Sequence, residues 1–147
     1  MTEPDARSVL DRERLEALLE TLLPGNGMWP GALELDLATE VLERAEMAEG
    51  HADSIGRVLD ALSPDFTTST QEQREAVLQP LAGSADFAAA LLVAYDAYYV
   101  DKRVLSLLEE RCGYVTRPPQ PQGFELEPFD ESILARARER EPFWRKA

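Results

Sequence analysis

The sequence predicts an all-α protein: a single compact domain of about five helices, followed by an extended, proline-rich C-terminal tail. Apolar residues recur at steps of three and four in successive segments that glycine and proline separate. Residues 114–116 are the one β-prone run, and they are too few to build a sheet. We expect residues 1–7 to be disordered, residues 8–115 to form the helical domain and residues 116–147 to form the tail with a short terminal helix.

The first helix is expected at residues 9–23. Ser8 followed by Asp11 is a variant of the capping box, and leucines then recur at helical spacing until Pro24 ends the helix. The loop that follows, LPGNGMWPGA, is rich in turn-forming residues, but its glycines lack the spacing of a phosphate-binding loop. We therefore expect Trp29, in this loop, to contact the core or a partner rather than a nucleotide.

Residues 33–49 are predicted to form the second helix, with apolar side chains on one face and carboxylates on the other. Glu40 and Arg44 have the spacing of an i,i+4 ion pair. Carboxylates on such a solvated face lack the dry cleft that acid–base catalysis requires. A short third helix is expected to begin near Asp53 or Ser54, after a glycine.

Overlapping capping boxes predict the start of the fourth helix. Ser69 and Thr70 are each followed three residues later by a side chain that can complete the box, Glu72 and Gln73 respectively. The helix is expected to stop within residues 80–83, where proline and glycine are found.

The segment that starts at Ser84 is expected to form the centre of the domain. Ser84 is a good N-cap, and Phe87 begins an apolar stripe, while alanine, leucine and valine make the opposite side apolar too. A helix with so little polarity on any face is expected to be central, with neighbours packed on several sides. Residues 101–103 interrupt the apolar run, so either one kinked helix or two helices precede the stop at Gly113.

Charge and composition narrow the possible partners. Fifteen basic and 28 acidic residues give a net charge of −13, which repels phosphate backbones and anionic membrane surfaces. The N-terminus has no basic start followed by an apolar run, and no stretch of 18 consecutive apolar residues occurs. We therefore expect a cytoplasmic protein that neither binds nucleic acid nor inserts into a membrane.

No catalytic, cofactor-binding or metal-binding residues are assigned. One cysteine and one histidine cannot make a closed zinc site, and no G-x-S-x-G motif is present. If the chain were an enzyme, Tyr98, Asp101 and Arg103 would be its best residues, although a helix interruption with a local ion pair explains Asp101 and Arg103 equally well. A stand-alone module that binds a small ligand in a groove lined by Tyr95, Tyr98 and Tyr99 is a further alternative.

The tail has the composition of an extended strip that needs a surface to lie on. Its prolines disfavour helix and sheet, and its apolar residues alternate with carboxylates. Two aromatic residues near the end also need a docking surface, because termini are disordered unless tied down. That surface is either the helical body or another protein. The residues concerned are Pro118, Pro119, Pro121, Pro128, Phe124, Leu126, Phe129, Phe143 and Trp144, and Asp130 is expected to cap a short helix at residues 133–140.

Three segments within residues 15–145 resemble a known family: ETLLPGNGMWPGA after the first helix, AYDAYYVDKRVLSLLE in the centre and RPPQPQGFELEPFDESIL in the tail. They are similar to the gluconate 2-dehydrogenase subunit 3-like family. The resemblance implies a helical, non-catalytic accessory subunit that binds a large FAD-dependent oxidoreductase of the glucose-methanol-choline type and helps it fold, persist or stay soluble. FAD would belong to that partner, which acts on sugars or related alcohols.

This chain differs from much of the family in lacking an export signal, including the twin-arginine kind, which favours a cytoplasmic or differently exported version. The expected partner interface combines aromatic residues, one arginine and the proline-rich strip, because aromatic residues and arginine dominate interface energetics. It consists of Trp29, Tyr95, Tyr98, Tyr99, Arg103, Pro118, Pro119, Pro121, Phe124, Phe129, Phe143 and Trp144.

Overall fold

The computed structural model describes residues 6–116 and 130–139, and every regular element in these ranges is helical. The all-α prediction is therefore confirmed. The chain divides into two compact units, Met1–Thr116 and Arg117–Ala147.

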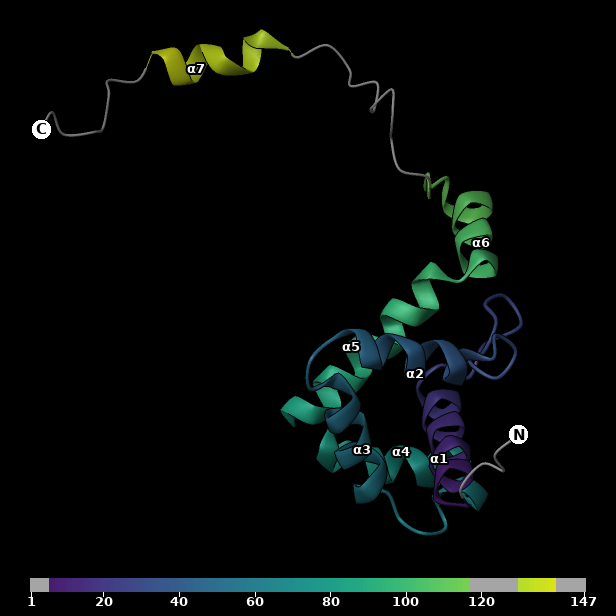
Figure 1. Cartoon of the computed structure of the whole chain (residues 1–147). Coiled ribbons are helices and arrows are strands. Elements are labelled where there is room, and N and C mark those ends of the chain that lie inside the picture. Colours follow the sequence, from purple (N-terminus) through teal and green to yellow (C-terminus); the bar gives the residue numbers. More distant parts are fainter. Residues whose placement is uncertain (1–5, 117–129, 140–147) are drawn as a thin grey trace, which may run out of the picture. The chain divides into compact units, whose positions relative to one another are not determined.

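Six α-helices build the described part of the first unit (Figure 1). They are α1 (Ala6–Leu22), α2 (Leu37–Met47), α3 (His51–Ala61), α4 (Gln71–Leu78), α5 (Ala85–Val100) and α6 (Lys102–Cys112), with short 3-10 turns at Phe66–Thr68 and Gln79–Leu81. In the second unit, a 3-10 turn at Glu131–Leu134 leads into the short helix α7 (Ala135–Arg138). Asp130 acts as a cap, as expected, by accepting the N–H of Ser132 at 2.9 Å. It caps the 3-10 turn, however, and the helix expected at residues 133–140 begins only at Ala135.

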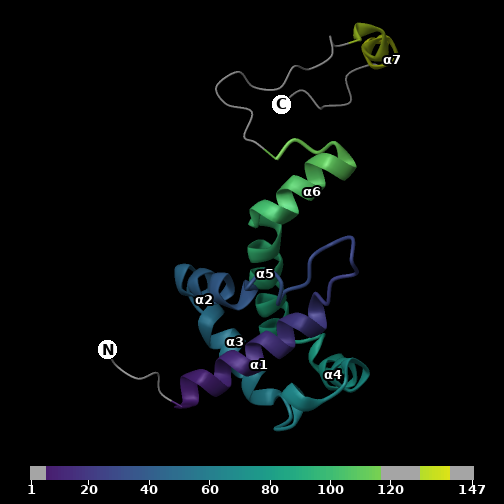
Figure 2. The ribbon, with the colours of Figure 1, turned by 90° about the vertical axis from the view of Figure 1, so that its right-hand side faces the viewer.

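The core of the first unit lies where α1, α2 and α3 meet α5. α5 packs against α2 and α3, while α1 packs against α2, α3 and α4. In Figure 2, α2 and α3 lie beside α5, and α6 extends beyond them. The largest fully buried side chains are Phe66, Leu15, Leu18, Leu19, Val41 and Val104.

Most helix ends are set by the local signals that the sequence contains. Gln73 donates its N–H to Thr70 Oγ1 at 3.4 Å and accepts the Thr70 N–H at 2.9 Å, which completes one of the two expected capping boxes. The second box does not form, because the hydroxyl of Ser69 donates to the Asp65 carbonyl at 2.8 Å instead. Ser84 caps α5 by accepting the N–H of Phe87 at 3.1 Å.

The apolar run that starts at Ser84 forms two helices. Asp101 adopts an extended conformation (φ −62°, ψ 131°) that ends α5, and its carboxylate accepts the N–H of Arg103 at 2.8 Å, which caps α6. Gly113, with φ of 65°, ends α6 where the sequence predicts a stop. One residue therefore serves as the C-cap of one helix and the N-cap of the next.

The prediction of α2 at residues 33–49 is wrong at its start, since the helix begins at Leu37. Residues 31–36 form a turn in which Leu35 donates its N–H to the Gly31 carbonyl at 3.3 Å, and Asp36 adopts a left-handed conformation with φ of 50°. The carbonyls of Glu34 and Leu35 accept hydrogen bonds from the distant side chain of Arg103. This tertiary contact stabilises the turn, and helical periodicity cannot predict it.

The other boundaries differ from expectation by a few residues. α3 begins at His51, ahead of the expected start, because Gly50 adopts φ of 81° and turns the chain there. α1 begins at Ala6 rather than at residue 9. Of residues 1–7, expected to be disordered, residues 6 and 7 belong to α1. Residues 1–5 lie outside the described residues.

Candidate interaction surface

Helix α5 is apolar on two opposite faces, and the described residues cover only one of them. The covered face packs against α2 and α3 and contains Phe87, Ala90, Val93, Ala94, Ala97 and Tyr98. The opposite face presents Leu92, Tyr95 and Tyr99, which are 61%, 42% and 54% exposed. The prediction that α5 has neighbours on several sides is therefore wrong for the described part of the chain.

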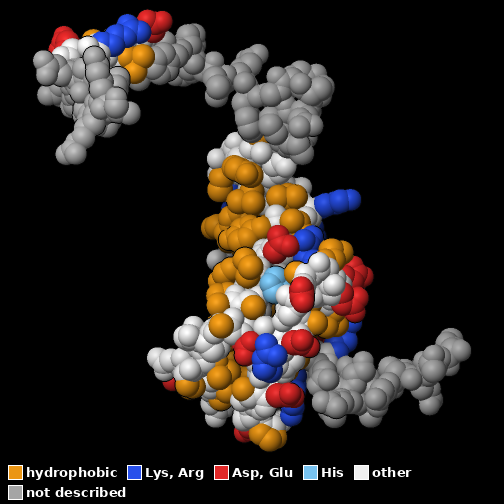
Figure 3. Space-filling view, turned by 60° about the vertical axis from the view of Figure 1, so that its left-hand side comes forward, with side chains coloured by type: hydrophobic (Ala, Val, Ile, Leu, Met, Phe, Trp, Pro, Cys, Tyr) orange, Lys and Arg blue, Asp and Glu red, His pale blue; other side chains and the backbone are white. Residues whose placement is uncertain are grey.

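We call the exposed set Leu92, Tyr95 and Tyr99 the α5 strip. These residues follow one another at steps of three and four, so they share one side of the helix. The rings of Tyr95 and Tyr99 lie 6.4 Å apart in a tilted arrangement. Figure 3 shows hydrophobic side chains gathered over α5 and α6 on one face of the molecule. Contiguous exposed apolar side chains make this face a candidate interaction surface.

Two ion pairs join α5 to the helices on its covered side. Asp96 Oδ2 lies 2.6 Å from Nη1 of Arg44 on α2, and Asp86 Oδ1 lies 2.8 Å from Nη2 of Arg57 on α3. Hydrogen bonds from Arg57 and from the Ser54 hydroxyl lower the pKa of Asp86. Because both aspartates are tied to the helices on the covered side, α5 cannot rotate about its axis to bury the strip without breaking these contacts.

The expected pair Glu40–Arg44 also forms, with 2.7 Å between Oε1 and Nε. Arg44 therefore bridges Glu40 on its own helix and Asp96 on α5. The guanidinium of Arg44 binds a carboxylate on α2 and another on α5, where these two helices pack together.

Tyr98 and Arg103 attach the loop that contains Trp29 to the junction of α5 and α6. The hydroxyl of buried Tyr98 donates to the Pro30 carbonyl at 3.1 Å, and burial raises the pKa of that hydroxyl. Arg103 donates Nη1 to the Glu34 carbonyl at 2.8 Å and Nη2 to the Leu35 carbonyl at 3.0 Å. These hydrogen bonds hold the chain at Pro30 and again at Glu34 and Leu35.

Asp101 orients the guanidinium that makes these contacts. Its carboxylate accepts hydrogen bonds from Nε and Nη2 of Arg103 at 3.2 and 3.1 Å. These bonds lower the pKa of Asp101 and raise that of Arg103. The two residues therefore form the local ion pair that the sequence allows, and their polar groups are directed at each other and at the loop.

The loop is closed by its own backbone and by Asn26. Oδ1 of Asn26 accepts the N–H groups of Met28 and Trp29 at 3.0 and 2.8 Å. Gly25 has φ of 72°, and a Cβ there would lie 2.6 Å from the nitrogen of Gly31, so both the conformation and the space require glycine. As a result Trp29 is half-buried against the core, while Met28 is 52% exposed.

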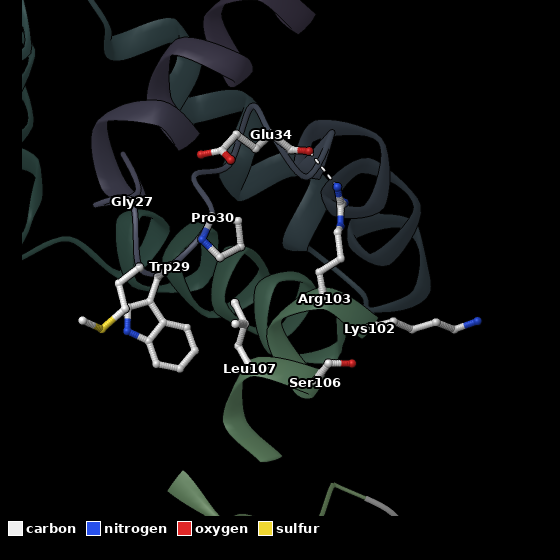
Figure 4. Close-up of a pocket in the computed structure, with 9 residues that line it drawn as sticks. Gly27, Trp29, Pro30, Glu34, Lys102, Arg103, Ser106 and Leu107 are labelled. Atoms are coloured by element: carbon white, nitrogen blue, oxygen red, sulfur yellow. Dashed lines mark hydrogen bonds between the residues drawn. The ribbon is translucent and has the colours of Figure 1, made fainter. Parts of the chain in front are cut away.

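Two hollows flank the side chain of Arg103. One, of about 570 Å³, lies between the Trp29 loop and the first turns of α6 (Figure 4). The other, of about 590 Å³, lies between the start of α2 and the end of α5. Neither is lined by Tyr95, Tyr98 or Tyr99, the residues expected to form a ligand groove.

The structure brings part of the expected interface together. Tyr99 packs edge-on against Tyr98 with 5.3 Å between ring centroids, and Tyr98 in turn holds the Trp29 loop. Tyr95, Tyr99 and Arg103 are exposed, whereas Tyr98 is buried. The remaining expected residues lie outside the described ranges: Pro118, Pro119, Pro121, Phe124, Phe129, Phe143 and Trp144.

Sequence reasoning did not assign Leu92, Met28 or Leu107 to the surface. Leu92 is the most exposed member of the α5 strip, and the other two line the hollow beside Arg103. The signal for Leu92 was its position on the second apolar side of α5. Nothing local distinguishes Met28 or Leu107, because their neighbourhood arises only when the loop meets α6.

Within residues 6–116 and 130–139, no group of three or more His, Cys, Asp or Glu side chains is arranged to hold a metal ion. None of the helices in these ranges combines the length and apolar composition that crossing a bilayer requires. Comparisons of the chain with protein-family models, with curated proteins and with solved structures found no match.

Proposed function

We propose that this chain is a non-catalytic accessory subunit that binds and stabilises a large FAD-dependent oxidoreductase acting on sugars or related alcohols. The observation that carries the proposal is the α5 strip, an apolar face that is left open by the helices described here. The identity of the partner rests on the resemblance of the loop, the α5–α6 segment and the tail to the gluconate 2-dehydrogenase subunit 3-like family. FAD and the chemistry belong to the partner, and the complex forms in the cytoplasm or is exported with the partner.

The composition of the strip supports a protein partner. Tyrosine is enriched at protein interfaces because its ring supplies a large apolar area while its hydroxyl tolerates water when the subunit is free. Two tyrosines and a leucine at helical spacing match the anchor pattern of a helix that docks against another protein surface. A partner that covers the α5 strip would remove its apolar side chains from water, which favours binding.

The charge of the chain supports a different protein rather than a second copy. Its net charge is −13, so two copies would repel each other at long range. A partner surface with an apolar centre and basic residues at its rim would be attracted instead. We therefore expect association to slow as salt is added, because salt screens charges at the rim.

Co-expression tests the proposal directly. The chain is produced with a large FAD-dependent oxidoreductase of the glucose-methanol-choline type, and the amount of soluble, flavin-loaded large subunit is measured with and without the chain. We expect the two proteins to co-purify and the large subunit to be less soluble alone. Leu92→Asp should weaken binding by at least about tenfold, because it places a charge in a desolvated contact.

Met47→Asp is the matched control, because Met47 is an exposed apolar residue on α2, outside the strip, and is 81% exposed. It should leave binding within about twofold of the unsubstituted chain, in line with the small effect of exposed positions outside the contact. If the large subunit is soluble and loaded with flavin without this chain, and no complex is recovered, the proposed function is wrong.

A further inference from the structure

We propose, on the basis of the function proposed above, that the hollow between the Trp29 loop and α6 receives an extended segment of the partner in which an apolar side chain neighbours a carboxylate. The α5 strip would then be one of two contacts on the same partner. This hollow is called the loop–α6 hollow below.

The size and walls of the hollow suit a side chain that serves as an anchor. Its volume of about 570 Å³ lies within the usual range for binding pockets, roughly 300 to 1,000 Å³. Met28, Trp29 and Pro30 from the loop and Leu107 from α6 supply apolar walls. Figure 4 shows Leu107 directed toward the space beside the Trp29 ring. An apolar group placed there would lie between the Trp29 loop and α6 and contact both.

The polar side of the hollow is cationic. Lys102 and Ser106 lie one helical turn apart on α6 and both line the hollow. Their side chains make no ion pair or hydrogen bond with the described part of the chain. Lys102 is exposed, and in Figure 4 its side chain extends away from Trp29 and Leu107, on the far side of Arg103. A carboxylate next to the anchor could accept hydrogen bonds from both groups.

The other charged groups at the hollow are already engaged. Oε1 of Glu34 accepts the N–H of Gly31 at 3.0 Å, and Figure 4 shows that carboxylate turned away from Lys102. Arg103 directs its donors at the carbonyls of Glu34 and Leu35 and at Asp101. Lys102 is therefore the cation left for an incoming carboxylate.

The hollow and the α5 strip are linked through buried Tyr98. Tyr99 of the strip contacts Tyr98, whose hydroxyl binds the carbonyl of Pro30 in the wall of the hollow. A single partner surface that covers Tyr99 can thus extend a short segment into the hollow. Because the hollow is open to solvent, a chain segment can enter it without any opening of the fold.

The test uses the full chain co-expressed with the large FAD-dependent subunit. p-Benzoylphenylalanine, a photo-crosslinking residue, replaces Ser106 in one variant and Tyr95 in a second. A third variant carries it at Glu72, an exposed residue of α4 that belongs to neither surface. After irradiation, the crosslinked peptides of the large subunit are identified by mass spectrometry. We expect position 106 to capture one segment with an apolar residue beside Asp or Glu, and position 72 to capture none.

Affinity measurements with the purified large subunit complete the test. We expect Leu107→Asp to weaken binding at least about tenfold and Lys102→Glu about threefold to tenfold, with Lys102→Arg close to the unsubstituted chain. Circular dichroism melting curves exclude variants that fail to fold. Rescue by arginine distinguishes a contact with a carboxylate from a structural role of Lys102.

The outcomes separate this inference from the proposed function. If crosslinks arise at position 95 but not at 106, and the variants of Leu107 and Lys102 bind normally, the inference is overturned while the accessory function stands. If position 106 captures a segment without a carboxylate, the inference is also overturned. If no complex forms at all, both proposals fail.

Discussion

Replacing Arg103 by methionine should loosen the Trp29 loop without disrupting the helices. The substitution keeps a long apolar stem and removes the donors that bind the carbonyls of Glu34 and Leu35. A hydrogen bond from a charged group contributes about 1.5–3 kcal/mol when it is buried. The side chain of Arg103 is 56% exposed, so we take about half of that for each of the two bonds. The free energy of unfolding should therefore fall by about 2 kcal/mol.

The ion pair with Asp101 adds little to this sum. Exposed pairs contribute about 0–1 kcal/mol, because water and salt screen them. Its main effect is to orient the guanidinium, since the carboxylate accepts from both Nε and Nη2. Arg103→Lys should consequently recover less than half of the lost stability, because an ammonium group cannot reach two carbonyls and a carboxylate in the same planar geometry.

Urea unfolding and tryptophan fluorescence measure the effect. In a Trp144→Phe background, Trp29 is the one tryptophan of the chain and reports on the loop. We expect Arg103→Met to lower the urea midpoint and to shift the Trp29 emission to the red before the helical signal is lost. Arg111→Met is the control, because Arg111 is exposed on the same helix, away from the loop. If Arg103→Met changes neither the midpoint nor the emission more than Arg111→Met does, the role assigned to Arg103 is wrong.

Three further substitutions test the core, the helix junction and a cap. Val104→Ala should reduce the free energy of unfolding by about 2 kcal/mol in urea titrations, because it removes fully buried methyl groups and leaves a cavity. Asp101 has a lowered pKa, so its charged form stabilises the fold above the unfolded pKa of about 3.9, and this stabilisation is lost as pH falls through the folded pKa. Asp101→Asn should thus lower the urea midpoint at pH 7 but bring it closer to that of the unsubstituted chain at pH 3, whereas a constant difference would contradict this reasoning. Ser84→Ala should cost about 1 kcal/mol through loss of the cap on the Phe87 N–H, measured by thermal melting, with Ser106→Ala as an exposed control.

The sequence could predict those parts of the fold that depend on contacts between near neighbours. The cap of α4 joins Thr70 and Gln73, and that of α5 joins Ser84 and Phe87. Both are bonds over three residues, so the pattern of residue types is enough to locate them. The left-handed Gly113 at the end of α6 is equally local.

Part of the candidate surface was also predictable. Tyr95 and Tyr99 stand out in the sequence as large aromatic residues on a helix with few polar neighbours, and they are exposed in the structure. Their role in binding a partner stays a prediction. The expected contribution of the tail, from Pro118 to Trp144, falls mainly on residues outside the described ranges.

The all-α class, the breaks at glycines and prolines, and most helix caps follow from the sequence, because each depends on hydrogen bonds or periodicity within one segment. Tertiary structure alone decided where α2 begins, since the carbonyls of Glu34 and Leu35 bind the side chain of a residue on α6. It also decided which side of α5 faces solvent. A helix that is apolar all round has no periodicity to indicate its buried face. Packing against α2 and α3 makes that choice, and the ion pairs of Asp86 and Asp96 with those helices accompany it.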